Sequence, residues 1–293
     1  MNYIKRNLED VVKQVTKEYP VVLVTGPRQV GKTTMLQKLM EGTDRGYVTL
    51  DDLNERNIAK TDPEMFLQLH KPPILIDEVQ YAPELFTYIK MNVDKNHEPG
   101  AFWLTGSQVF NMMRGVQESL AGRVAVLSLT SLSQAEISGG EMEPFTIEMG
   151  ALTERKEERE ETDTRGVFER IYKGSMPAIV SGANSNSQIF YSSYLSTYLE
   201  RDVKELSYAI DSLKFLRFIT AVAARCGQMV NVAEIARDAD INQTQAKNCK
   251  KQAKTYIFRQ LISSTFRQSK TSTFITAYIS RGFLPGFCIA IFS

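Results

Sequence analysis

Residues 26–34 read Gly-Pro-Arg-Gln-Val-Gly-Lys-Thr-Thr and directly follow the apolar run VVLVT at 21–25. Two glycines enclose four other residues, and Lys32 and Thr33 come next. This spacing is typical of a loop whose backbone N–H groups surround a phosphate group at the start of a helix. Glycine lets the main chain approach the anion closely. Lys32 would reach the β- and γ-phosphates, and the Thr33 hydroxyl would be a ligand of Mg²⁺.

The sequence therefore predicts that one continuous segment binds the nucleotide, and that Arg28 inside it is a further candidate for a phosphate contact. The alternative is a glycine turn that only opens a helix, but the apolar run before the loop and the amphipathic stretch after it favour the phosphate loop. The predicted nucleotide-binding residues are Gly26, Pro27, Arg28, Gln29, Val30, Gly31, Lys32, Thr33 and Thr34.

A second motif, PPILIDEVQ at 72–80, is acidic. In it, Asp77 and Glu78 directly follow a run of four apolar residues. A carboxylate that ends a buried strand beside the phosphate loop can hold Mg²⁺ through its water shell, so Asp77 is a predicted metal ligand together with Thr33. Glu78 would orient and deprotonate a water aimed at the γ-phosphate. This neighbouring glutamate favours hydrolysis over phosphoryl transfer to a substrate. The alternative is a solvated strand end with two chance acids.

Other polar residues are weaker candidates for the same site. Thr105 or Ser107, in WLTGSQ, would hydrogen-bond the γ-phosphate or the attacking water if their strand ends beside the loop. Arg123, in SLAGR, would neutralise transition-state charge within the chain or across a subunit boundary, or would serve only as a structural arginine. Asp51 and Asp52 would support the Mg²⁺ shell or, as we favour, cap the next helix.

The elements that must position these residues form an alternating pattern. Amphipathic stretches such as 32–40 and 82–93 separate short apolar runs, which suit the strands of a parallel sheet covered on both faces by helices. We therefore predict an α/β fold, the P-loop NTPase (AAA-like) parallel sheet flanked by helices, and we take the strand order 5-1-4-3-2 as its working hypothesis. The predicted strands are 21–26, 47–50, 73–78, 101–106 and 123–129.

The second half of the chain has a different pattern. Residues 154–166 are nearly all charged, which indicates a solvated helix or linker. Apolar residues then recur at helical spacing, and the pattern over 227–248 predicts a helix, a turn and a second helix capped by Asn242. The predicted domains are an ATP-binding domain over 1–150, a linker over 151–166, a helical region over 167–214, a winged-helix-like segment over 215–248 and a divergent basic tail over 249–293.

Composition excludes several classes of protein. Hydrophobic residues make up 43% and charged residues 24%, which is ordinary for a globular protein. No apolar stretch approaches the roughly 20 residues of a membrane helix, and the start becomes charged too early for a secretion signal. The three cysteines show no paired spacing, so neither disulfides nor zinc are predicted. We expect a cytoplasmic protein that makes no membrane contact.

The motifs GPRQVGKTT, LDD, ILIDEVQ, LTGSQ and SLAGR occur in an order that resembles the AAA-superfamily ATPases of bacteria and archaea with a C-terminal domain of unknown function. YLERDV at 198–203 is similar to that family too. The resemblance covers about residues 1–248. It implies binding of ATP and Mg²⁺, hydrolysis, a winged-helix-like segment and then a region with a nuclease-like fold.

The tail departs from this family. The last 45 residues carry seven of the 35 Lys and Arg and none of the 34 Asp and Glu. We expect the resemblance to stop near Asn248, inside the second helix, and interpret the tail as the product of a reading-frame shift that truncates the protein. The competing hypothesis is a basic arm that binds nucleic acid. Resequencing the coding region would distinguish the two.

The leading prediction is a Mg²⁺-dependent ATPase that converts ATP to ADP and phosphate and moves its helical regions against an unknown protein partner. It leaves open whether the protein forms a homo-oligomer and whether this version is active. One alternative is a nucleotide-gated interaction switch with little or no hydrolysis, and another is a DNA-associated protein. A small-molecule kinase is the least favoured, because Glu78 suits a water nucleophile.

Overall fold

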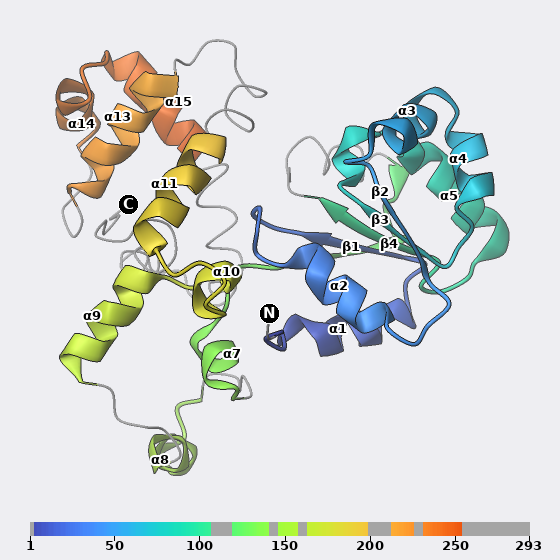
Figure 1. The fold of residues 1–293 in the computed structure, drawn as a ribbon, viewed down its shortest axis with the longest axis horizontal. Coiled ribbons are helices and arrows are strands. Elements are labelled where there is room, and N and C mark those ends of the chain that lie inside the picture. Colours follow the sequence, from blue (N-terminus) through green and yellow to red (C-terminus); the bar gives the residue numbers. More distant parts are fainter. Residues whose placement is uncertain are drawn as a thin grey trace. The chain divides into compact units, whose positions relative to one another are not determined.

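The computed structural model divides the chain into two compact units (Figure 1). One unit consists of residues 5–131, and the other contains residues 1–4 and the residues from Leu132 onward. The structure describes residues 3–106, 119–140, 146–157, 163–198, 212–225 and 231–253.

The first unit is built on a five-stranded sheet in which every neighbouring pair of strands is parallel. The strand order is β2-β3-β4-β1-β5, which confirms the predicted order read from the other edge. Each predicted apolar run contains a strand, and the bounds are β1 Val21–Thr25, β2 Gly46–Thr49, β3 Ile74–Asp77, β4 Phe102–Gly106 and β5 Val124–Ser128.

Helices flank this sheet on both faces, which confirms the predicted α/β class. Figure 1 shows α1 and α2 on one side of the strands and α3, α4 and α5 on the other. A short 3-10 helix, η1, follows β3 directly. The bounds are α1 Leu8–Thr16, α2 Lys32–Met40, α3 Leu53–Thr61, α4 Pro63–Leu69, η1 Val79–Tyr81 and α5 Leu85–Asn96.

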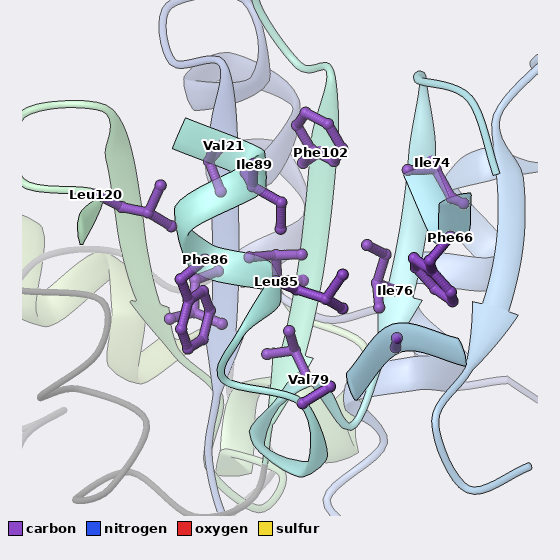
Figure 2. Packing of buried hydrophobic residues seen from close by; sticks show 14 of the residues in the cluster. Val21, Phe66, Ile74, Ile76, Val79, Leu85, Phe86, Ile89, Phe102 and Leu120 are labelled. Atoms are coloured by element: carbon purple, nitrogen blue, oxygen red, sulfur yellow. The ribbon is translucent and has the colours of Figure 1, made fainter. Parts of the chain in front are cut away.

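The core of this unit lies between the sheet and the helices α4 and α5. Leu85, Phe86 and Ile89 of α5 are fully or almost fully buried, and they pack in one cluster with Val21 of β1 and Phe102 of β4 (Figure 2). β1, β3 and β4 are buried along their whole length, as expected for strands covered on both faces. Each fully buried Val, Leu, Ile or Phe side chain of this core stabilises the fold by about 1.5–3 kcal/mol.

The described part of the second unit is helical. The charged linker predicted over 151–166 overlaps α8 and the start of α9, and its role as a linker stays a prediction. The bounds are α7 Gln134–Ser138, α8 Met149–Glu157, α9 Thr164–Lys173, α10 Pro177–Val180, α11 Ser187–Tyr198, α13 Ser212–Ala223, α14 Val232–Asp238 and α15 Gln243–Ala253.

The predicted helix–turn–helix corresponds to α14 and α15. Asn242 accepts a hydrogen bond from the backbone N–H of Gln245 at 2.8 Å, and the Gln245 side chain accepts one from the Asn242 N–H at 3.1 Å. This reciprocal pair confirms Asn242 as the cap of the second helix. A winged-helix fold and contact with DNA stay predictions. Most of the predicted tail, from residue 254 onward, lies outside the described residues.

Among the residues that the structure describes, no helix combines the length and the apolar character needed to cross a membrane.

Candidate phosphate-binding site

The predicted phosphate loop connects β1 to α2, and its glycines occupy positions that other residues would not tolerate. Gly26 has φ 149°, and a Cβ atom there would lie 2.0 Å from the carbonyl oxygen of Leu129. Gly31 has φ 90° and caps α2 in the left-handed conformation. Gln29, also at positive φ, completes a loop that turns sharply into the helix. Pro27 and Val30 are buried, Gln29 is exposed and Arg28 is half-buried.

We expect Gly26→Ala to lower the free energy of unfolding by about 2–4 kcal/mol and to weaken nucleotide binding, because the added methyl group overlaps the Leu129 carbonyl. Chemical denaturation and calorimetry would measure the two effects. The control is Gly42→Ala, which also has a positive φ but no atom within 4 Å of the added Cβ. A Gly26→Ala protein as stable as the Gly42→Ala protein would contradict the expected overlap.

Lys32 begins α2 and is only 6% exposed. Its ammonium group donates to the Gly26 carbonyl at 3.0 Å and to the Pro27 carbonyl at 2.8 Å. The positive charge of Lys32 therefore lies beside Gly26 and Pro27, the first two residues of the loop. Thr33, next along the helix, is half-buried and faces β3, whereas Thr34 is exposed.

Hydroxyl groups from three elements converge on the Asp77 carboxylate, which is 7% exposed. Thr33 donates to Asp77 Oδ1 at 2.7 Å, and Thr105 donates to the same oxygen. The Tyr47 hydroxyl lies 3.4 Å from Asp77 Oδ2. Burial raises the pKa of the Tyr47 phenol, and the Asp77 carboxylate raises that pKa further. Asp77 is thus fixed beside the hydroxyl with which it is predicted to share a metal ion.

Thr105 connects the Asp77 carboxylate to the backbone of Glu78. It is fully buried, and its hydroxyl accepts a hydrogen bond from the backbone N–H of Glu78 at 3.1 Å while it donates to Asp77. Glu78 itself adopts the left-handed conformation, with φ 56°, and its carboxylate accepts a hydrogen bond from the Gln80 amide. The predicted contact of Thr105 with the γ-phosphate stays a prediction. The contacts that the structure gives Thr105 are with Asp77 and Glu78.

The strand register explains why these residues meet. Asp77 is the last residue of β3, Thr105 pairs with Val24 near the end of β1, and Thr25 precedes the loop. The carboxyl ends of parallel strands lie at one edge of a sheet, and ligands of such sheets bind there. The sequence-predicted Lys32, Thr33, Asp77, Glu78 and Thr105 are therefore brought together, although they span 74 positions of the chain.

Arg123 lies at the opposite edge of the sheet. It immediately precedes Val124, which pairs with the first residue of β1, whereas the loop follows the last residue of that strand. At about 3.3 Å per residue, roughly 15 Å of strand separates the two edges. The Arg123 guanidinium donates to both carboxylate oxygens of Asp94 and to the Ala121 carbonyl. The structure does not bring Arg123 to the loop of its own chain, and its role across a subunit boundary stays a prediction.

Ser107, the other candidate in the motif after β4, lies outside the described residues. Asp52 is the N-cap of α3, where its side chain accepts from the N–H groups of Asn54 and Glu55, so the favoured capping role is confirmed. Asp51 is exposed and lies 3.8 Å from Arg56. Neither aspartate contacts Asp77 in the interactions that the structure gives.

Three residues of the site were missed by sequence reasoning. Gln80, which holds Glu78, stands inside the quoted acidic motif, but nothing in its spacing indicated a role. Tyr47 lies on the neighbouring strand β2, in a run that was predicted only as an apolar strand. Arg6 contacts the loop from a segment 20 residues earlier in the chain. Nothing in the sequence around this single basic residue indicates that it contacts the loop.

The first unit has the P-loop NTPase fold, a parallel sheet of strand order β2-β3-β4-β1-β5 with helices on both faces. A family model described as an AAA domain matches residues 18–138. A second model, described as a domain of unknown function, matches residues 164–271. This second match runs past Asn248, so the resemblance extends further than the sequence analysis predicted.

The chain is similar to uncharacterized proteins of Mycobacterium tuberculosis and Mycobacterium bovis. It is 29% identical to each over 244 residues, which cover 83% of this chain and 49% of each relative. The chain thus spans about half the length of the curated relatives it matches. Among solved structures it resembles a Walker-type ATPase of Pyrococcus abyssi, with 14% identity and a TM-score of 0.52 over 87% of this chain and 90% of that one. At this identity the likeness shows the fold alone.

Proposed function

We propose that this protein binds ATP with Mg²⁺ and hydrolyses it to ADP and phosphate. The observation that carries the proposal is the hydrogen-bonded series Thr33–Asp77–Thr105–Glu78 beside the loop. It places two oxygen groups suited to a metal and one carboxylate suited to a water within one connected set. The AAA-domain match over this region supports the same activity.

The residues present fit Mg²⁺, because Thr33 Oγ1 and Asp77 Oδ1 are hard oxygen donors only 2.7 Å apart. Thr33 would hold the ion directly and Asp77 through water, and Mg²⁺ when bound would neutralise charge on the phosphates. Lys32 would turn from the loop carbonyls toward the β- and γ-phosphates. The loop N–H groups, from Gly26 to Thr34, would bind the phosphate oxygens.

Glu78 would then accept the proton of the attacking water. Gln80 holds its carboxylate and Thr105 holds its backbone, so the position of this base is set from both ends. We assign Thr105 a positioning role on this ground. Hydrolysis would change the contacts of the loop and so move the helical regions. These regions would act on an unknown protein partner. We place this activity in the reducing cytoplasm.

The test is calorimetry of ATP with and without Mg²⁺, followed by steady-state phosphate release from the same preparation. We expect binding that strengthens with Mg²⁺ and turnover that requires it. Binding without phosphate release would favour the nucleotide-gated switch instead. Absence of any heat from folded protein would contradict the proposal as a whole.

A further inference from the structure

Arg6 is a buried cation that the proposed mechanism does not use. It precedes α1, is 4% exposed, and directs its guanidinium group to two separate segments of the first unit. Nη1 donates to the Val30 carbonyl, inside the phosphate loop, at 2.7 Å. Nη2 donates to the Thr130 carbonyl at 2.7 Å and to the Ser131 carbonyl at 3.4 Å.

We propose that Arg6 is a positioning residue for the phosphate loop, which it ties to Thr130 and Ser131 so that the loop keeps its phosphate-binding shape. This inference rests on the proposed binding of ATP. A guanidinium charge is costly to bury without partners, and here backbone carbonyls provide them. Moving the loop away from the segment after β5 would separate these groups, so the arrangement resists that motion.

The two ends of the loop are held by different contacts. At the beginning, the Leu129 N–H donates to the Thr25 carbonyl at 2.8 Å, and the Leu129 carbonyl lies against Gly26. These contacts continue the pairing of β1 with β5. Val30, at the other end of the loop, is beyond this ladder. Arg6 fixes it to the same segment through a side chain.

The contact has a direct consequence for an amide that is predicted to bind phosphate. In a planar trans peptide the C=O and the following N–H point in opposite directions. Arg6 holds the Val30 carbonyl, so the Gly31 N–H must point away from Arg6. Loop N–H groups form the anion site of P-loop proteins, and a freely rotating Val30–Gly31 peptide would lose one of them.

Arg6 is itself held in place by the start of α1. Its backbone N–H donates to the Glu9 carboxylate at 2.6 Å, and Glu9 is also buried. The neighbouring Lys5 differs, because its side chain is 70% exposed and its ion pair with Asp10 is 3.7 Å long. Lys5 therefore provides a matched control of the same charge, one residue away.

The experiment compares Arg6→Ala and Arg6→Lys with Lys5→Ala. We expect Arg6→Ala to weaken the affinity for MgATP about 10- to 100-fold in calorimetry, because charged hydrogen bonds to the loop are lost. Arg6→Lys should retain part of the affinity, since one ammonium group can still reach a carbonyl. Lys5→Ala should bind as the unchanged protein does. In turnover, KM for ATP should rise while kcat at saturating ATP stays near its original value, because Glu78 and Thr105 are untouched.

Hydrogen exchange without nucleotide separates positioning of the loop from general stabilisation. In Arg6→Ala the amides of residues 28–33 should exchange faster, while those of β3 keep their protection. Unchanged affinity and unchanged loop exchange in folded Arg6→Ala would overturn the inference. If Arg6→Ala does not fold, the same two results in Arg6→Lys would overturn it. If the unchanged protein binds no ATP, the proposed function fails, and loop exchange alone still tests Arg6.

Discussion

Replacing Glu78 by glutamine is expected to lower kcat for ATP hydrolysis by about 10²- to 10⁴-fold, the usual contribution of a general base. A glutamine amide has the same shape as the carboxylate but cannot accept the water proton. Its carbonyl oxygen can still accept the hydrogen bond from Gln80, and its backbone N–H can still donate to Thr105. The fold and the binding of MgATP should therefore be retained.

Phosphate release gives kcat and calorimetry gives the affinity of the same Glu78→Gln protein. The matched control is Glu84→Gln, an exposed glutamate at the start of α5 whose side chain makes no capping hydrogen bond. Full activity is expected for the control. Turnover in Glu78→Gln equal to that of the control would remove Glu78 from the role of base and shift attention to another group near the strand edge.

Replacing Lys32 by methionine is expected to weaken MgATP binding by about 100-fold or more, because the ammonium group that would face the β- and γ-phosphates is lost. Methionine matches the length of the aliphatic part of lysine, so the packing of this buried side chain should survive. The hydrogen bonds to the Gly26 and Pro27 carbonyls are lost as well. We therefore also expect a small decrease in the free energy of unfolding.

Calorimetry with ATP and thermal unfolding with and without nucleotide would measure both effects. Lys38→Met is the control, since Lys38 lies on the same helix but is 47% exposed and pairs with Glu41 at 2.7 Å. We expect the control to bind ATP normally. Equal affinity of the two variants would mean that Lys32 does not contact phosphate, and the assignment of the loop would then be wrong.

The fold of the first unit was predictable because the apolar composition of its strands indicates that they are buried. β1, β3 and β4 are apolar except near their carboxyl ends and are buried along their whole length, and strands of that kind occur in parallel sheets with both faces covered. The predicted strand order is confirmed. Asp52 and Asn242 were recognised as caps for a similar reason, because a cap acts on N–H groups two or three residues away. Such local interactions are contained in short stretches of sequence.

The placement of Arg123 was harder to predict because it depends on strand direction. Its motif precedes the strand, so a parallel sheet sends it to the edge away from the loop, where Asp94 accepts its hydrogen bonds. The charge of Arg123 alone does not determine the end of the sheet at which it lies. For Thr105 the end of the sheet was predicted correctly. Its predicted partner was the γ-phosphate or the attacking water, whereas in the structure its hydroxyl donates to Asp77 and accepts from the Glu78 N–H.

The class of fold could be predicted from the sequence, and the phosphate loop and the acidic strand end were proposed from it, because each of these patterns consists of contiguous residues with fixed spacing. Which side chains hold these groups in place became clear only from the folded chain. Gln80 acts on Glu78 from two residues away, whereas Arg6 reaches residues more than 120 positions away through contacts that the packing of the chain selects. No local pattern encodes such a contact, since it depends on where the sheet brings distant segments together.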